Sequence, residues 1–125
     1  MLFRSRFVLV TGRPPGWMRD IAAAFGHRGT AICANGALAY DMATDTVTAR
    51  QMIPPSVLAT AVAALRVAVP GIGIAVEYPD GHAADAGYQA LNWEVNQSIA
   101  RLPDAELFAH PASKLLGRQI GRAHV

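Results

Sequence analysis

The sequence lacks the features that would tie it to an oxidising compartment or to a membrane. Cys33 is the only cysteine among 125 residues, so no internal disulfide can form and a reducing compartment is expected. No apolar run approaches the roughly 20 residues that a membrane-spanning helix needs. The N-terminal stretch MLFRSRFVLV has neither the long apolar segment nor the cleavage site of a signal peptide. We therefore predict a cytoplasmic protein without a membrane partner.

The sequence also lacks the signatures of several common function classes. Lys114 is the only lysine, the net charge is +2, and arginines are interspersed with acidic residues along the chain instead of forming a basic block. Nucleic acid is therefore not an expected partner. The chain contains no G-x-G-x-x-G and no G-K-[ST], which disfavours dinucleotide and P-loop sites. The histidines have no metal-ligand spacing, so we expect His27, His82 and His110 to lie on the surface or in loops.

What the sequence does contain is a strand, a sharp turn and a helix in quick succession near the N-terminus. Residues 7–10, FVLV, predict a short buried strand, and Thr11-Gly12-Arg13 follows it directly. Pro14-Pro15 suits the first turn of a helix, whose apolar face would carry Trp17, Ile21 and Phe25 and whose C-terminal cap would be Gly26. A second apolar strand at 31–34 ends in Asn35-Gly36. This order predicts a parallel βαβ unit.

The remainder of the chain is patterned less clearly. Two β-prone runs at 37–40 and 46–51 predict a hairpin, and Pro54-Pro55 opens a helix that ends before Pro70. The helix would bury three residues: Leu58, Val62 and Leu65. Residues 71–78 predict a strand that leads into the turn Pro79-Asp80-Gly81. Residues 82–99 fit a strand that enters a helix, and one or two more strands are expected after Pro103.

The turn at Thr11 is a candidate anion site on physical grounds. Thr11 and Asn35 each close a strand of the predicted parallel pair, so both should lie at the edge of the sheet where ligands bind in open α/β folds. Thr11 offers a hydroxyl donor, Gly12 lets backbone approach a ligand closely, and the positive end of the following helix favours an anion. A capped turn that binds nothing is the alternative interpretation of the same residues.

The residues FVLVTGRPPGWMRDIAAAFG and AICANGALAYD resemble the second-motif region of the haloacid dehalogenase-like hydrolases, and more narrowly of the Cof-like sugar-phosphate phosphatase group. The resemblance implies an α/β fold, in which a partial Rossmann-like parallel sheet core is followed by an α/β cap segment. Residues 1–52 would belong to the core and residues 53–119 to the cap. The last six residues, IGRAHV, resemble a translated sequencing adapter, so we expect 120–125 to be a non-native tail.

The resemblance also implies a chemistry: hydrolysis of small phosphorylated metabolites through an aspartyl-phosphate intermediate, with Mg²⁺ as cofactor. Thr11 matches the hydroxyl that hydrogen-bonds the transferring phosphoryl group and is the one catalytic residue carried over. Gly12 and Arg13 complete that turn, and Asn35 and Gly36 match the substrate-side N-G; all five are expected to bind substrate or phosphate. No metal ligand carries over to this chain.

Other motifs of the family are not found in these 125 residues. The nucleophile motif D-x-D-G-[TS] should precede Thr11, but residues 1–10 contain no aspartate. Lys114 is followed by leucine, not by the glycine of the family's catalytic K-G, so we interpret it as a lysine on a cap strand. We therefore expect a fragment that is inactive by itself. The alternative is a small non-catalytic α/β module that binds a ligand or a partner.

Three further interpretations concern single residues or small groups of residues. Cys33 lies within an apolar strand, which favours a buried, inert thiol over a nucleophile. Tyr88 and Trp93 are expected to pack in a core, with a substrate pocket as the alternative. The acidic residues near the 79–81 turn, Glu77, Asp80 and Asp85, are expected to be solvated and not to form a metal site.

Overall fold

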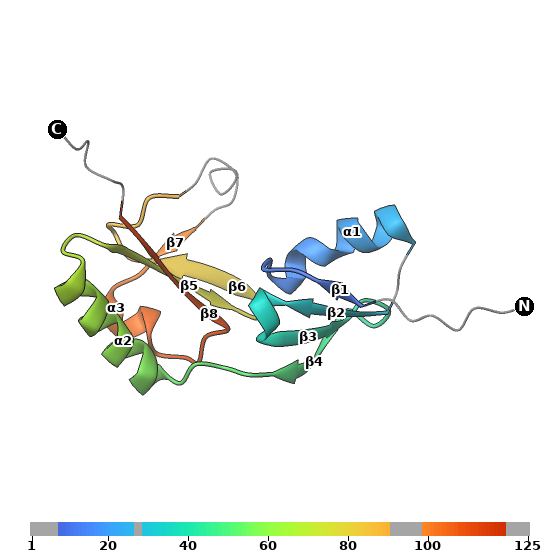
Figure 1. The fold of residues 1–125 in the computed structure, drawn as a ribbon, viewed down its shortest axis with the longest axis horizontal. Coiled ribbons are helices and arrows are strands. Elements are labelled where there is room, and N and C mark those ends of the chain that lie inside the picture. The colour runs from blue at the N-terminus through green and yellow to red at the C-terminus, as the bar shows by residue number, and fades with distance from the viewer. Residues whose placement is uncertain (1–7, 27–28, 91–98, 120–125) are drawn as a thin grey trace, which may run out of the picture. The chain divides into compact units, whose positions relative to one another are not determined.

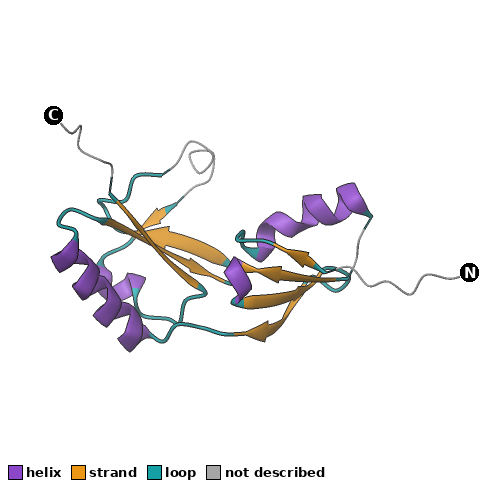
Figure 2. Ribbon diagram, viewed as in Figure 1, coloured by secondary structure: helices purple, strands orange, loops and turns teal. Residues whose placement is uncertain are grey.

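The structure is a computed structural model that describes residues 8–26, 29–90 and 99–119 (Figure 1). The chain divides into two compact units, Met1–Met52 and Ile53–Val125, here called unit 1 and unit 2. Each unit has its own four-stranded sheet (Figure 2). The mixed α/β fold class predicted from the sequence is therefore confirmed.

Unit 1 contains a sheet in the order β1-β2-β3-β4. Its strands are β1 (Leu9–Val10), β2 (Thr30–Cys33), β3 (Leu38–Asp41) and β4 (Thr46–Arg50). β1 and β2 are parallel, as the predicted βαβ unit requires, whereas β3 runs antiparallel to both β2 and β4. The predicted hairpin is thus confirmed, and its strands are β3 and β4.

The crossover between β1 and β2 consists of a 3₁₀ turn, η1 (Pro15–Trp17), and the helix α1 (Met18–Phe25). Gly26 caps α1 in the left-handed conformation, with a φ of 63°, as its position after the apolar run predicted. The prediction that Trp17 begins the buried helical face was wrong by one position. Trp17 belongs to the 3₁₀ turn before α1, and Met18, the first residue of α1, is the side chain that this helix buries completely.

The core of unit 1 lies between α1 and the middle of its sheet. The buried apolar side chains include Met18, Ala31, Cys33, Leu38 and Tyr40. Ala31 and Cys33 alternate with less buried neighbours along β2, as expected for a strand with one face toward the core. Burial raises the pKa of the Cys33 thiol, which favours the uncharged and unreactive form. The predicted buried thiol is confirmed.

Unit 2 contains a sheet in the order β7-β6-β5-β8. Its strands are β5 (Gly73–Tyr78), β6 (Gly81–Ala84), β7 (Ala100–Arg101) and β8 (Lys114–Arg118). β5 is antiparallel to β6 and β8, whereas β6 and β7 are parallel. Lys114 begins β8, in line with its interpretation as a strand lysine.

Two helices pack on one face of this sheet: α2 (Pro55–Ala68) and α3 (Asp104–Leu107) (Figure 1). The larger core lies beneath them and joins Leu58 and Val62 of α2 to Ile74 and Val76 of β5, with Leu107 of α3. Leu58 and Val62 are buried, and Leu65 packs against them, so the predicted buried face of this helix is confirmed. The helix α3 occupies a segment for which the sequence had predicted only strands.

The other face of the same sheet has a smaller core made of Ala75, Ala84 and Tyr88. β5 is therefore buried on both faces, which explains why its sequence is apolar at consecutive positions. Tyr88 is 3% exposed and packs in this core, as expected. Trp93 and residues 120–125, also discussed above, lie outside the described residues.

Arginine side chains on the sheet form hydrogen bonds to the segment 85–90, which carries Tyr88. Arg101 on β7 donates from Nη1 to the carbonyl of Asp85 at 2.8 Å and to that of Tyr88 at 2.5 Å. Arg118 on β8 donates to the carbonyl of Gln89 at 2.7 Å. Two arginines on different strands thus hold one loop, which covers the smaller core of unit 2.

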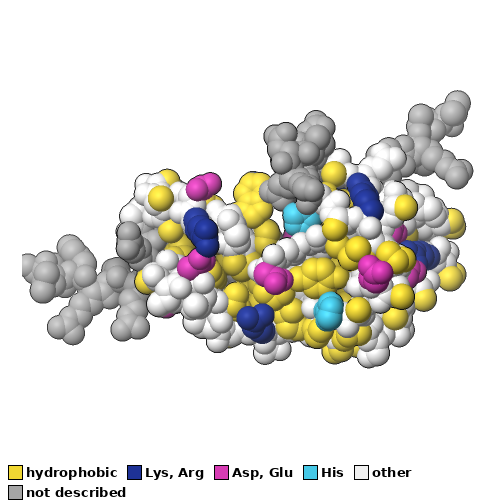
Figure 3. Space-filling model, turned by 180° about the vertical axis from the view of Figure 1, so that it is seen from behind, with side chains coloured by type: hydrophobic (Ala, Val, Ile, Leu, Met, Phe, Trp, Pro, Cys, Tyr) yellow, Lys and Arg dark blue, Asp and Glu magenta, His cyan; other side chains and the backbone are white. Residues whose placement is uncertain are grey.

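Figure 3 shows both basic and acidic side chains at the surface of the described residues. Within the described ranges, no helix is long and apolar enough to cross a membrane.

Candidate functional site

The five residues singled out in the sequence, Thr11 to Arg13 with Asn35 and Gly36, meet at one corner of unit 1. Since β1 and β2 are adjacent and parallel, their carboxyl ends open onto the same edge of the sheet. The Thr11 N–H donates to the carbonyl of Ile32 at 2.9 Å, which extends the strand pairing to the start of the turn. We call residues 11–13 together with 34–36 the Thr11 corner.

Three further hydrogen bonds close the Thr11 corner. The Ala34 N–H donates to the carbonyl of Arg13 at 3.0 Å, and the Asn35 N–H donates to the carbonyl of Thr11 at 3.3 Å. Within the turn, the Arg13 N–H donates to the hydroxyl oxygen of Thr11 at 3.1 Å. The Thr11 hydroxyl therefore accepts one hydrogen bond from its own turn, and its proton can be donated to a ligand acceptor.

Residues 34–36 follow a left-handed path. The φ angles are 51° for Ala34, 56° for Asn35 and 99° for Gly36. Glycine and asparagine tolerate this region, whereas alanine is strained there by about 1–3 kcal/mol. Ala34 is 2% exposed and belongs to the core of unit 1, so packing holds it in this conformation. Strained backbone of this kind often lies at functional sites.

Gly12 is in contact with the side chain of Asn35. A Cβ atom built on Gly12 would lie 3.1 Å from Oδ1 and 3.3 Å from Nδ2 of that side chain. The sequence predicted that Gly12 leaves room for a ligand. In the structure, the Asn35 amide takes up part of that room.

Arg13 and Trp17 form a pair at the outer side of the turn. The Arg13 guanidinium carbon lies 4.3 Å from the centroid of the Trp17 ring, within the range of a cation–π interaction. Arg13 is exposed and brings a permanent positive charge to the corner. The indole, which was predicted to pack on the helix face, instead supports this guanidinium.

The start of α1 differs from the expectation that a helix N-terminus directly follows the turn. α1 begins at Met18, after Pro14, Pro15 and the 3₁₀ turn. The two prolines have no N–H, and the Trp17 and Met18 N–H groups donate to the carbonyls of Pro14 and Pro15. The Trp17 and Met18 donors are thus used within the turn, and the two prolines contribute no donor at all.

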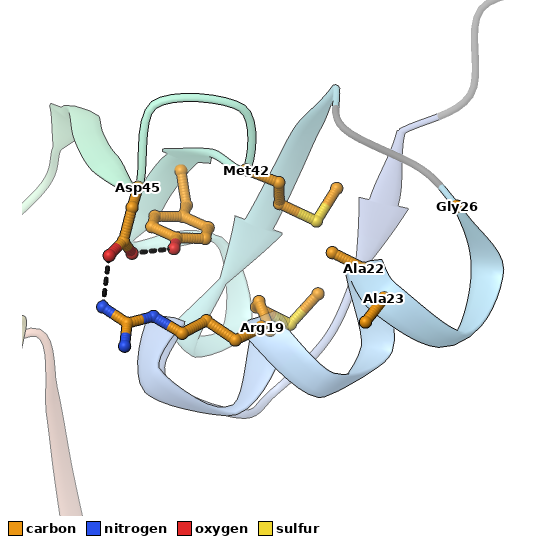
Figure 4. A pocket seen from close by; sticks show the side chains of 8 residues that line it. Arg19, Ala22, Ala23, Gly26, Met42 and Asp45 are labelled. Atoms are coloured by element: carbon orange, nitrogen blue, oxygen red, sulfur yellow. Dashed lines mark hydrogen bonds and ion pairs between the residues drawn. The ribbon is translucent and has the colours of Figure 1, made fainter.

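A second feature of unit 1 is a cavity of about 380 Å³ between α1 and the β3–β4 hairpin (Figure 4). It is lined by Met18, Arg19, Ala22, Ala23, Gly26, Tyr40, Met42 and Asp45. The Asp45 carboxylate accepts hydrogen bonds from the Tyr40 hydroxyl and from the Arg19 guanidinium. These bonds lower the pKa of Asp45. The network contains none of the residues singled out in the sequence, and no local spacing pattern relates Arg19 to Asp45.

Metal binding by the residues that the structure describes would need a cluster of ligand side chains. Those residues contain no group of three or more His, Cys, Asp or Glu side chains that could hold a metal ion. Of the acidic residues considered earlier, Asp85 accepts a hydrogen bond from Arg66 at 3.2 Å, and Asp104 accepts from the same guanidinium at 2.5 Å. Arg66 therefore connects α2, α3 and the start of the 85–90 loop.

Residues 5–78 match the family described as haloacid dehalogenase-like hydrolase. Among solved structures, a protein from Geobacillus kaustophilus is 11% identical with a TM-score of 0.63, over 88% of this chain and 43% of its own. BT1666 from Bacteroides thetaiotaomicron, from a study of phosphatases of the HAD superfamily, is 17% identical with a TM-score of 0.60, over 82% and 38%. SMU.1108c from Streptococcus mutans is 17% identical with a TM-score of 0.57, over 67% and 31%.

The identities to these structures are low, so the likeness is one of fold. The chain spans well under half of the length of each of the three solved proteins. A search of curated proteins found no match.

Proposed function

Because this chain belongs to the haloacid dehalogenase-like hydrolase family, we propose that it is part of a phosphatase of the Cof-like group. The enzyme would hydrolyse small phosphorylated metabolites through an aspartyl-phosphate intermediate. In this proposal, the Thr11 corner belongs to the phosphoryl site of the catalytic core, and unit 2 belongs to the cap that selects the substrate.

The arrangement of the Thr11 hydroxyl is the observation that carries this proposal. Its oxygen accepts the Arg13 N–H at 3.1 Å, at the edge of two parallel strands, so that its proton is the group left for a ligand. Negative charge is spread over the phosphoryl oxygens during transfer, and a fixed donor at that place lowers the barrier. We assign to Thr11 the donation of a hydrogen bond to one of those oxygens.

The other residues of the corner have supporting roles in this proposal. Arg13 contributes positive charge from an exposed guanidinium that Trp17 holds by a cation–π contact. The left-handed path through Asn35 and Gly36 brings the end of β2 close to the turn. Gly12 admits this approach because it has no side chain.

The nucleophile and the metal are not assigned to residues of this chain. Residues 1–10 contain no aspartate or glutamate. Mg²⁺ prefers several oxygen ligands, and the described residues contain no cluster that would supply them. The described residues thus do not fit a magnesium site. In this proposal, the carboxylates of the reaction would come from elsewhere in the enzyme.

The separate packing of unit 2 supports its assignment to a cap. Its sheet has a separate hydrophobic core and is closed by α2 and α3 on one face. The division between the units falls directly after Met52, two residues beyond the end of β4. We therefore propose that residues 53–119 belong to the cap.

The proposal is tested with the protein expressed from the complete reading frame that contains these residues. Phosphate release is measured with Mg²⁺ on a panel of phosphorylated metabolites. Thr11→Ala should lower kcat by about 10²–10³-fold, the effect of losing one donor to the developing charge. Thr11→Ser keeps the hydroxyl and should retain most of the activity. Binding without turnover, or full activity of Thr11→Ala, would contradict the proposal; binding alone would favour the non-catalytic module.

A further inference from the structure

Asn35 contacts the 11–13 turn in two separate ways. Its backbone N–H donates to the Thr11 carbonyl at 3.3 Å. Its side-chain amide lies against Gly12, so closely that a Cβ on Gly12 would be 3.1 Å from Oδ1. Any residue other than proline could make the first contact, because it uses the backbone N–H. The second contact requires the asparagine side chain.

The backbone at this position does not explain why the residue has a side chain. A φ of 56° suits glycine at least as well as asparagine, and glycine follows directly at position 36. The side chain is exposed, so it contributes little to the core of unit 1. The contact with Gly12 is the interaction that the amide adds.

A restraint on Gly12 matters because of the residue beside it. Glycine has the largest backbone freedom of any residue, and Gly12 lies between Thr11 and the Arg13 N–H that binds the Thr11 hydroxyl oxygen. Rotation of the peptide units around Gly12 would move that N–H and release the hydroxyl from its orientation. An amide packed on Gly12 limits this movement.

We propose that Asn35 is a positioning residue, whose side-chain amide packs on Gly12 and keeps the Thr11 hydroxyl aimed at the phosphoryl group. This inference rests on the proposed function and adds how its donor is held. It differs from direct contact between Asn35 and substrate, because all of the effect passes through Thr11.

A double-mutant cycle between the two positions separates these roles, again with the complete protein. Asn35→Gly tolerates the left-handed backbone and removes the side chain that carries the amide. In the wild-type background it should lower kcat by about tenfold and change KM by less than about threefold, since small misplacements of a catalytic group are costly. In the Thr11→Ala background it should have no further effect.

The other outcomes overturn the inference. An equal loss in both backgrounds, or a rise in KM alone, would mean that Asn35 contacts the substrate directly. An unchanged kcat in Asn35→Gly would mean that the amide does not act on Thr11. If Thr11→Ala itself retains full activity, the proposed function fails, and this inference fails with it.

Asp45→Gly is the matched control. It removes a polar side chain from another left-handed residue of unit 1, with a φ of 55°, outside the Thr11 corner. Its activity should equal that of the wild type. Melting curves of all variants show whether any loss of activity reflects unfolding, and a loss in Asp45→Gly equal to that in Asn35→Gly would overturn the inference.

Discussion

Gly73, the first residue of β5, offers a sharp test of how unit 2 is packed. A Cβ on Gly73 would lie 2.4 Å from the Cα of Tyr88 and 2.8 Å from the carbonyl oxygen of Gly87. These are backbone atoms, so no side-chain rotation can relieve the contact. The segment 85–90, which Arg101 and Arg118 fasten to the sheet, must move if residue 73 becomes alanine.

The size of the effect follows from that displacement. Ordinary carbon contacts begin at 3.4 Å, so the backbone at Tyr88 must retreat by about 1 Å. Overpacking of this kind lowers the free energy of unfolding by about 1–3 kcal/mol. Complete loss of tyrosine burial, at about 25 cal/mol per Å² over 150–250 Å², sets an upper bound of about 4–6 kcal/mol. We predict that Gly73→Ala destabilises unit 2 by about 1–3 kcal/mol.

Urea unfolding of the full chain, followed by circular dichroism, measures this change against Gly81→Ala. Gly81 begins the neighbouring strand β6, has no atom within 4 Å of its built Cβ, and does not have a positive φ. Both substitutions reduce the freedom of the unfolded chain equally, so their difference isolates the contact with Tyr88. A Gly73→Ala variant within about 0.5 kcal/mol of Gly81→Ala would refute the packing argument.

Three further predictions concern single side chains. Hydrogen bonding by Arg66 lowers the pKa of Asp104, so the stabilisation is present above the unfolded pKa of about 4 and is lost as the pH falls through the folded value. Asp104→Asn should therefore weaken the acid dependence of the urea midpoint below about pH 4. Burial of Cys33 and its raised pKa predict that a thiol reagent at pH 8 labels the native chain far more slowly than the urea-unfolded chain; equal rates would contradict this. Leu58→Ala should destabilise by about 2–5 kcal/mol, whereas Val57→Ala, at a side chain 51% exposed, should stay within about 0.5 kcal/mol when both are compared by urea unfolding.

The sequence was most informative where neighbouring residues decide the structure. Pro55 and Leu58 predicted the start and the buried face of α2, and Gly26 predicted the end of α1. Such signals depend on backbone conformation and on the helical repeat, which act over a few residues.

The predictions from sequence failed where neighbouring residues give no clear signal for a helix boundary or for an interaction partner. Trp17 lies in a short 3₁₀ turn instead of α1, and Met18 is the buried residue at the start of the helix. Asp45 forms an ion pair with Arg19, which is distant in the sequence, so no local spacing pattern predicts this pair. The helix α3 spans only four residues, too few to produce a periodic signal.

The amino-acid sequence by itself determined which residues form the Thr11 corner, because T-G-R and N-G each follow an apolar strand and such turn chemistry is local. Only the tertiary structure decided how these residues meet. The pairing of β1 with β2 brings Asn35 against Gly12, and the core of unit 1 holds Ala34 in a left-handed conformation. Those contacts join residues that are distant in the chain, so they exist only once the sheet has formed.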